Sequence, residues 1–302
     1  MLNQKDGRPG GFGGVAVVGV GLMGRRIAGQ FARGGYDVVI TDSNAGVLAA
    51  ACREAAAMAR GNGSVRADSV LAAAVEHADL VIEAIAEDLH AKQELFALLS
   101  TSAPAAVLAT NTSVLPVTAV AARAGDPSLV VGTHWWNPPD LIPVVEVVRG
   151  KHTDPAVVER VVAALSHLGK VPVRVNRDVP GFIGNRLQHA LWREAIALIA
   201  DGVCDAETVD LVVRNTIGLR LGEMGPIENA DYVGLDLTLA IHDAVLPSLN
   251  RDPFPSPLLR ELVAQGNFGA RSGRGFLGWP GGARERAASR LSAHIEAQLS
   301  QR

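Results

Sequence analysis

Cysteine is scarce in this chain of 302 residues, which contains only Cys52 and Cys204. Two cysteines this far apart form neither a metal-binding pattern nor an evident disulfide pair. No apolar run approaches the length of a membrane-spanning helix, and the first thirteen residues are polar and glycine-rich, without the apolar core of a signal peptide. We therefore expect a cytoplasmic protein with no membrane partner and no bound metal, and a flexible tail over residues 1–13.

The chain also lacks a marked excess of either charge. Its net charge is -3, from 28 lysines and arginines against 31 aspartates and glutamates, and these residues are mixed along the sequence. Nucleic-acid-binding proteins usually carry a basic patch or tail, so no nucleic-acid partner is expected. The length suits two domains with enough chain to bury a sizeable core.

Glycines gather in residues 14–42. An apolar run, Val15–Val18, leads into the segment Gly19-Val20-Gly21-Leu22-Met23-Gly24. A helical stretch and a second apolar run, Val38–Ile40, follow, and Asp42 comes next. This order of strand, glycine turn, helix, strand and acidic residue is typical of a dinucleotide-binding βαβ unit.

Each glycine of this turn has a physical task. Gly19 permits the tight turn, Gly21 lets a pyrophosphate approach the backbone, and Gly24 lets the helix pack closely on the strand. The amides at the helix N-terminus, from Leu22 and Met23, are free to bind phosphate. The Asp42 carboxylate is placed to accept hydrogen bonds from both ribose hydroxyls. It would repel a 2′-phosphate, and Ser43-Asn44 offers no arginine, so the pattern favours NAD over NADP.

Apolar strands and helical stretches alternate as far as Val175. Further strands are expected at Asp79–Glu83, Ala106–Ala109, Leu129–Thr133, Pro143–Val148 and Val171–Val175. Beyond Pro180 only helical patterns occur, at about 182–201, 205–216, 229–249, 256–264 and 283–302. The fold class is therefore α/β, with a Rossmann-type NAD-binding domain over residues 14–180 and a second, all-helical C-terminal domain over residues 181–302.

Seven separated motifs then occur in one order. They are VGVGLMG, ADLVIEAIAED with Lys92 after it, TNTSVL, THWWNPP with VVEVV, DVPGFIGNR, MGPIENADYVGLD and FGARSGRGF. From Val15 to about Trp279 the sequence resembles the 3-hydroxyacyl-CoA dehydrogenase family, which includes the 3-hydroxybutyryl-CoA dehydrogenases. The resemblance implies NAD-dependent interconversion of a 3-hydroxy and a 3-keto group of a small-molecule substrate. It also implies a homodimer formed through a C-terminal substrate and dimerisation domain.

The resemblance also assigns roles to individual residues. His134 stands at the position of the catalytic histidine and Glu146 at that of its carboxylate partner, while Ser113 and Asn185 match residues that contact substrate and orient the histidine. The remaining matches are to cofactor-binding positions, mostly around the nicotinamide half of NAD: Glu87, Lys92, Asn111, Asn137 and Arg271. Arg271 replaces a residue that is often lysine, which keeps the charge but changes the geometry.

These residue types suit the chemistry. Oxidation of an alcohol by NAD needs a base for the hydroxyl proton, and a histidine titrates near working pH and serves both directions. A buried carboxylate on the other ring nitrogen fixes the tautomer and stabilises the imidazolium. His134 is expected to follow one strand and Glu146 to lie within the next. Trp135 and Trp136 have two open interpretations, an aromatic wall of the site or filling of the core.

Two other functional classes share features with this sequence. The β-hydroxyacid dehydrogenases share the glycine motif but use a lysine in their helical domain, whereas the lysines here (Lys5, Lys92, Lys151 and Lys170) all precede it. A non-catalytic NAD-binding structural protein is the other alternative. The presence of His134, Glu146, Ser113 and Asn185 together favours an enzyme.

The residues that would recognise the substrate leave more than one substrate class open. Only thirty-six residues separate Asp42 from Asp79, which is short for the region that supplies CoA contacts in the family, and Met58 occupies what an ungapped alignment makes a polar CoA-contacting position. The loop HWWNPPDLIP resembles relatives that oxidise free hydroxy acids or ring-borne alcohols. The alternatives to a 3-hydroxyacyl-CoA are therefore a gulonate-, carnitine-, pyridine-carboxylate- or polyketide-type substrate without a CoA handle.

Overall fold

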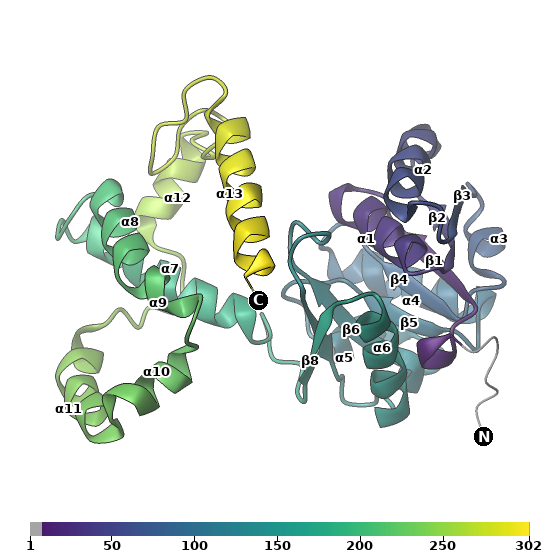
Figure 1. Ribbon diagram of the computed structural model, residues 1–302, viewed down its shortest axis with the longest axis horizontal. Helices are drawn as coiled ribbons and strands as arrows, with labels where there is room; N and C mark the ends of the chain where they lie inside the picture. The colour runs from purple at the N-terminus through teal and green to yellow at the C-terminus, as the bar shows by residue number, and fades with distance from the viewer. Residues whose placement is uncertain (1–7, 302) are drawn as a thin grey trace. The chain divides into compact units, whose positions relative to one another are not determined.

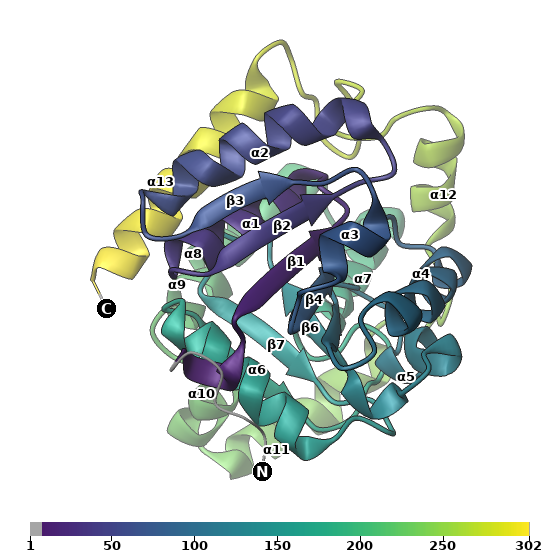
Figure 2. The same ribbon diagram turned by 90° about the vertical axis from the view of Figure 1, so that its right-hand side faces the viewer.

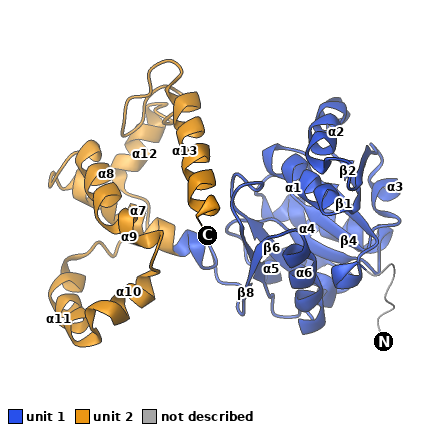
Figure 3. Cartoon of the chain, viewed as in Figure 1, with its two compact units in different colours: residues 1–186 blue, residues 187–302 orange. Residues whose placement is uncertain are grey.

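The computed structural model describes residues 8–301, and the chain divides into two compact units, Met1–Arg186 and Leu187–Arg302 (Figure 3). The division falls within helix α7 (Gly184–Ala200), so the first residues of this helix belong to the N-terminal unit. The first unit contains all the named strands of the described chain, and the second is helical. Both parts of the expected fold class, the Rossmann-type domain and the all-helical domain, are confirmed.

An eight-stranded sheet forms the centre of the N-terminal unit. Its order is β3-β2-β1-β4-β5-β6-β7-β8, and all neighbouring strands are parallel except β6 and β7, which are antiparallel. The strands are β1 (Gly14–Val18), β2 (Asp37–Thr41), β3 (Ser64–Ala67), β4 (Leu80–Glu83), β5 (Val107–Thr110), β6 (Val130–Trp135), β7 (Val144–Val148) and β8 (Val171–Val175). The sequence did not predict β3. This short strand lies at the sheet edge with three of its four residues exposed, so no buried apolar run marks it.

Helices cover both faces of this sheet (Figures 1 and 2). One hydrophobic cluster joins Val15 and Val17 to helices α1, α2 and α6, and a second joins Ala16 and Val18 to α3, α4 and α5. Successive residues of β1 therefore serve opposite faces, as the alternation of a strand requires. The helices are α1 (Leu22–Arg33), α2 (Ala45–Ala59), α3 (Leu71–Val75), α4 (Leu89–Ser102), α5 (Val117–Val120) and α6 (Pro155–His167).

Residues 8–13 of the expected tail instead pack against this unit. Phe12 is fully buried, and the Arg160 guanidinium lies 4.4 Å from the centre of its ring. The Tyr36 hydroxyl donates a hydrogen bond of 3.0 Å to the carbonyl of Pro9. The remainder of the expected tail, residues 1–7, lies outside the described residues.

The C-terminal unit consists of helices and connecting loops. After α7 come α8 (Ala206–Asn215), α9 (Ile217–Leu221), α10 (Pro226–Val233), α11 (Leu235–Val245), α12 (Pro257–Ala264) and α13 (Ala283–Ser300). The helix expected over residues 229–249 is in fact α10 and α11, separated at Gly234, whose φ of 101° interrupts a helix. Among its described residues, 187–301, only Ala197 is buried. No helix between residues 8 and 301 has the length and apolar character to cross a membrane.

Candidate active site

His134 and Glu146 are direct cross-strand neighbours. The antiparallel pairing of β6 and β7 sets His134 opposite Glu146, and their side chains meet with Nδ1 2.7 Å from Oε2. Both side chains are almost completely buried. The strand expected to end at Thr133 continues to Trp135, so His134 lies inside β6 and not after it. Its position is therefore fixed by sheet hydrogen bonding as well as by its side-chain partner.

The second carboxylate oxygen of Glu146 is also occupied. Oε1 accepts hydrogen bonds from the backbone amides of Ile183 and Gly184, at 2.9 and 3.1 Å. Burial raises the pKa of Glu146, but the hydrogen bonds from His134 and from the two amides outweigh it and hold the pKa below its usual value. An ionised carboxylate only accepts hydrogen bonds, so the proton of neutral His134 sits on Nδ1. Between residues 8 and 301, no side chain or backbone group is hydrogen-bonded to His134 Nε2.

Two aromatic rings lie beside His134. The ring centre of Trp136 is 5.0 Å away and that of Phe182 is 5.8 Å away. Trp136 packs against Gly184 so closely that a Cβ atom there would stand 2.2 Å from its Cζ2. Trp135 points to the opposite face of the sheet, where it is buried against Phe31 of α1. The two interpretations of the tryptophan pair thus apply to one residue each, because Trp135 fills the core and Trp136 lines the site.

Asn185 connects the start of α7 to the turn after β5. Its side-chain amide donates a hydrogen bond of 2.9 Å to the backbone carbonyl of Ser113. Asn185 is buried, and it directly follows the two amides that bind Glu146. One short segment, residues 183–185, therefore orients the His134–Glu146 pair and places Asn185 next to Ser113.

Glu87 and Lys92 belong to a charged group beneath this turn, in which Lys92 is buried and Glu87 is 36% exposed. One oxygen of Glu87 accepts hydrogen bonds from the Thr112 hydroxyl and from the amides of Ser113 and Val114. Burial raises the pKa of Glu87, but these hydrogen bonds and the charge of Lys92 outweigh that effect and hold the pKa below its usual value. The Lys92 ammonium is almost fully buried and lies 3.3 Å from Glu87.

Glu83 completes this group, and it was not among the expected site residues. The Lys92 ammonium lies 2.6 Å from Glu83, whose other carboxylate oxygen accepts a hydrogen bond of 2.7 Å from the Thr110 hydroxyl. Both acids and Thr110 follow or end buried strands. A charged residue that closes an otherwise apolar run, as Glu83 closes β4, is the signal that could have identified it.

The other expected cofactor residues have separate surroundings. The Asn111 side chain accepts a hydrogen bond of 3.0 Å from the backbone amide of Trp135, which links the ends of β5 and β6. Asn137 is exposed and follows Trp136 in the loop after β6. Arg271 belongs to the C-terminal unit, where its guanidinium lies 5.0 Å from the ring centre of Phe268.

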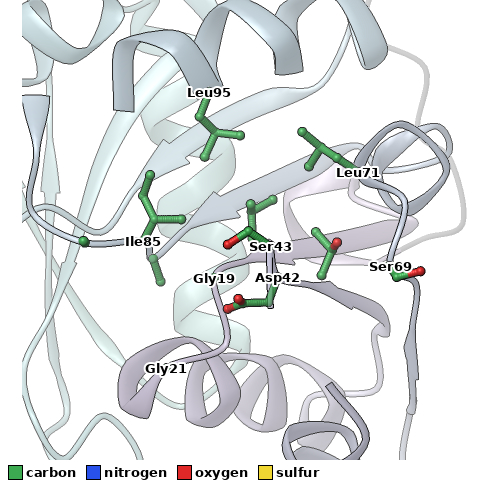
Figure 4. Close-up of a pocket in the computed structure, with 12 residues that line it drawn as sticks. Gly19, Gly21, Asp42, Ser43, Ser69, Leu71, Ile85 and Leu95 are labelled. Carbon is green, nitrogen blue, oxygen red and sulfur yellow. The ribbon is translucent and has the colours of Figure 1, made fainter. Parts of the chain in front are cut away.

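A pocket of about 540 Å³ opens at the carboxyl ends of β1, β2 and β4 (Figure 4). Gly19 lies there with a φ of 89°, and a Cβ on Gly24 would stand 1.8 Å from the Gly19 carbonyl oxygen, so both positions require glycine. A Cβ on Gly21, by contrast, would meet no atom within 4 Å, so a side chain there would fill the open space before the N-terminus of α1. The glycine turn therefore fits the pyrophosphate of a dinucleotide.

Asp42 and two other wall regions shape the rest of this pocket. The Asp42 carboxylate accepts hydrogen bonds from the amides of Val20 and Asn44, at 2.8 and 2.9 Å, and so holds the glycine turn while facing the pocket. Figure 4 shows further lining side chains that sequence reasoning did not identify: Ser69, Leu71, Ile85 and Leu95. Ser69 and Leu71 follow β3. Because the sequence did not predict this strand, it gave no indication that the residues after its carboxyl end line the pocket.

Family models match both parts of the chain. The model described as 3-hydroxyacyl-CoA dehydrogenase, NAD binding domain, covers residues 14–179, and the model of the C-terminal domain covers residues 181–279. The chain is 34% identical over 280 residues to 5-formyl-3-hydroxy-2-methylpyridine 4-carboxylate 5-dehydrogenase of Mesorhizobium japonicum, with 87% of this chain and 89% of the relative covered. It is 36% identical over 278 residues to a probable 3-hydroxybutyryl-CoA dehydrogenase of Deinococcus radiodurans, with 86% and 98% covered.

Solved structures show the same relationship. The crystal structure of a 5-formyl-3-hydroxy-2-methylpyridine 4-carboxylic acid 5-dehydrogenase, an NAD-dependent dismutase, matches with a TM-score of 0.89 and 30% identity, and 94% and 96% of the two chains are covered. The (S)-3-hydroxybutyryl-CoA dehydrogenase of Ralstonia eutropha matches with a TM-score of 0.71 and 28% identity, with 89% and 99% covered. The expected family is confirmed by these matches together with the motifs and the glycine-turn pocket. The chain belongs to the 3-hydroxyacyl-CoA dehydrogenase family of NAD-dependent oxidoreductases.

Proposed function

We propose that His134 is the acid/base of this dehydrogenase, acting on a secondary 3-hydroxy group that is interconverted with a 3-keto group. The observation that carries the proposal is the state of its two ring nitrogens. Nδ1 is held by the ionised Glu146, and Nε2 has no partner among the described residues. A histidine buried for packing alone would be expected to satisfy both nitrogens.

In the oxidation direction, Nε2 of His134 takes the hydroxyl proton as hydride leaves the carbon. Bound NAD supplies the hydride acceptor. Glu146 stabilises the imidazolium that forms, and the two amides on its other oxygen keep the carboxylate from turning away. In the reduction direction the imidazolium returns the proton to the keto oxygen.

Ser113 and Asn185 complete the proposed catalytic set. The Ser113 hydroxyl and the Asn185 carbonyl oxygen have no hydrogen bond to any other group between residues 8 and 301, so they are free to meet the substrate. Lys92, which is too buried to reach solvent, acts by holding Glu87, which holds the backbone of Ser113. Asn111, Asn137 and Arg271 are assigned with Glu87 to the surroundings of the nicotinamide.

Replacement of His134 by glutamine tests the central assignment. The variant should lose turnover by about a hundredfold or more, because general acid/base catalysis typically contributes that much. NADH binding, followed by its fluorescence, should change little, because His134 lies on a different strand from the glycine turn. Near-normal turnover would remove His134 from the mechanism. The matched control is His152→Gln, which alters an exposed histidine after β7.

A second proposal is that substrate binding does not depend on a CoA handle. Helix α2 ends at Ala59 and the chain enters β3 at Ser64, so no long hairpin extends from this side of the sheet. Met58 packs inward on α1, where a Cβ on Gly29 would stand 2.8 Å from its sulfur. Residues 43–78 contain three arginines and no lysine. Arg66 faces Asp68 at 3.8 Å, so only Arg53 and Arg60 of this segment have no carboxylate partner among the described residues.

Two relatives support this proposal by their names. The Mesorhizobium enzyme is named for a pyridine carboxylate, and an L-carnitine dehydrogenase of Streptomyces griseus is 40% identical over 225 residues. Without a grip on a nucleotide tail, binding energy comes from the acyl part itself. The catalytic efficiencies for 3-hydroxybutyryl-CoA and free 3-hydroxybutyrate should then agree within about tenfold, which corresponds to about 1.4 kcal/mol. A preference of several orders of magnitude for the thioester would overturn this proposal.

The C-terminal unit provides the grounds for a proposed homodimer. Large apolar side chains stand on the surface of several of its helices, among them Leu219, Ile227, Tyr232 and Leu235. Apolar surface on this scale marks an interface, and a second copy of the chain is the partner that the family resemblance implies. Residues 14–180 are assigned to the cofactor and 181–302 to substrate binding and dimerisation. A cytoplasmic location stays a prediction from the sequence.

A further inference from the structure

The loop between β6 and β7, residues 136–143, joins the two strands that carry His134 and Glu146. We term it the β6–β7 loop. It reads WNPPDLIP, and its three prolines have no amide hydrogen to donate. Inside the loop, the Pro138 carbonyl accepts hydrogen bonds from the amides of Leu141 and Ile142, at 3.1 and 2.9 Å. Two other carbonyls of the loop, those of Pro139 and Ile142, bind a cation from elsewhere in the unit.

That cation is Lys170, which stands in the turn between α6 and β8. Its ammonium donates hydrogen bonds to the carbonyls of Pro139 and Ile142, at 2.6 and 3.0 Å. It also lies 5.5 Å from the ring centre of Trp135. The residue is buried, and no carboxylate among residues 8–301 lies within 4.0 Å of the ammonium. Backbone dipoles and an aromatic face therefore take the place of an ion pair.

A second cation holds the other side of the same loop. Arg26 of α1 forms an ion pair of 2.9 Å with Asp140, at the tip of the loop. The N-terminus of α1 faces the nucleotide pocket. Lys170 directly precedes β8, which is the edge strand at the other end of the sheet from β3. The β6–β7 loop is thus fastened at two points, one on the nucleotide-binding helix and one beside the strands of the His134–Glu146 pair.

We propose that Lys170 is a positioning residue for the dehydrogenase reaction, holding the β6–β7 loop in place so that Trp136 keeps its position beside His134. The inference rests on the catalytic role proposed for His134. Trp136 is the first residue of the loop and packs between His134 and Gly184. A loop released at Pro139 and Ile142 leaves the chain after Trp136 less constrained, so that this ring is held mainly by its contacts with His134 and Gly184. A displacement of about 1 Å near the reacting atoms lowers a rate by about a hundredfold.

The pKa of Lys170 makes its hydrogen bonds to the β6–β7 loop dependent on pH. Burial lowers the pKa of Lys170 to about 8, while the charge of Asp140 raises it and that of Arg33 lowers it. Arg26 acts on this balance through its ion pair with Asp140. Below pH 8 the ammonium makes charge-assisted hydrogen bonds to both carbonyls. As the pH rises through about 8 the charge is lost, so the loop is held less firmly on the alkaline side.

Lys170→Met tests the proposal, with Lys151→Met as its matched control because Lys151 is exposed. Hydrogen exchange measured by mass spectrometry on peptides covering residues 136–148 reports the loop directly. Lys170→Met should exchange faster than the wild type at Leu141 and Ile142 at the same pH, and Lys151→Met should not. With 3-hydroxybutyrate and 3-hydroxybutyryl-CoA as the two probes, the kcat of Lys170→Met should fall about tenfold or more while the KM for NAD stays within about twofold.

The pH profile separates positioning from a merely structural role. The wild type should lose kcat above a pH of about 8, and Lys170→Met should lack this alkaline limb. Asp140→Asn, which removes the charge that raises the lysine pKa, should move the limb to lower pH. Asp140 is partly exposed, and this variant decides the question if Lys170→Met fails to fold.

Two results would overturn the proposal. The first is a Lys170→Met variant whose hydrogen exchange and kcat equal those of the wild type. The second is an Asp140→Asn variant whose alkaline limb lies at the same pH as in the wild type. The exchange measurement needs no substrate, so its outcome is independent of the proposed function. If His134→Gln retained turnover, the acid/base assignment would fail, and the exchange at Leu141 and Ile142 would still show whether Lys170 holds the loop.

Discussion

Phe31 and Leu219 are both large apolar residues on helices, but their surroundings differ. Phe31, on α1 of the N-terminal unit, is 1% exposed and packs against Tyr36 and Trp135. Leu219, on α9 of the C-terminal unit, is 70% exposed. The contrast extends to the whole of each unit, since two large hydrophobic clusters fill the first and Ala197 alone is buried among residues 187–301 of the second.

This difference indicates how each unit obtains its stability. A parallel sheet covered by helices on both faces buries its own apolar residues, so the N-terminal unit carries a complete core within one chain. The helices of the C-terminal unit leave apolar faces that water disfavours, and a second copy can cover them. The cofactor pocket and the His134–Glu146 pair are thus built on the unit that carries its own hydrophobic core.

The largest expected effect is on the core of the N-terminal unit. Phe31→Ala should lower the free energy of unfolding by about 3–5 kcal/mol, since it removes a buried ring and leaves a cavity. Leu219→Ala in a monomeric chain should change it by no more than about 0.5 kcal/mol, as is usual for an exposed site. Chemical denaturation of both variants measures the difference. Equal losses would contradict the comparison of the two units.

Dimerisation gives the next effect. Ile227→Glu places a charge on an exposed apolar position of α10, and it should weaken self-association by at least about tenfold, or 1.4 kcal/mol. Sedimentation velocity over a range of protein concentrations measures this. Ser289→Glu is the matched control, because it adds the same charge to an exposed polar position of α13. A wild-type chain that stays monomeric at all concentrations would end the dimer proposal.

The N-terminal unit was largely predictable because its strands are buried apolar runs bounded by turns. The glycine turn, the alternation up to Val175 and the change to helices could all be read from residue patterns. Edge strand β3 could not, since exposure removes the apolar signal, and with it went Ser69 and Leu71 of the pocket. In the C-terminal unit, one helix was expected over residues 229–249 because a single glycine inside a periodic stretch does not reveal its φ.

The candidate site shows a similar limit. His134 and Glu146 were paired by resemblance, but their direct opposition depends on the antiparallel register of β6 and β7, which spacing alone does not specify. Lys92 was expected beside the cofactor, but the burial of Lys92 and Lys170 was not foreseen, because a sequence does not show which charged residues are buried. Both turn out to hold backbone segments beside the site, one through Glu87 and one directly.

The smallest effect expected is on cofactor choice, which sharpens the comparison because the pocket lies wholly in the N-terminal unit. Asp42 faces this pocket with a carboxylate held by the amides of Val20 and Asn44. Both oxygens keep lone pairs for ribose hydroxyls, whereas a 2′-phosphate would meet a fixed negative charge. The wild type should therefore use NAD much better than NADP.

Asp42→Ala should narrow that ratio rather than reverse it. The repulsion disappears, but no arginine stands at Ser43 or Asn44 to bind a 2′-phosphate. The change is measured as the ratio of kcat/KM for the two cofactors. Asp37→Ala is a suitable control, because Asp37 starts the same strand at its opposite, exposed end. A wild type that prefers NADP would show that Asp42 at the end of β2 does not exclude a 2′-phosphate. An Asp42→Ala ratio identical to that of the wild type would move the origin of the preference to another wall of the pocket.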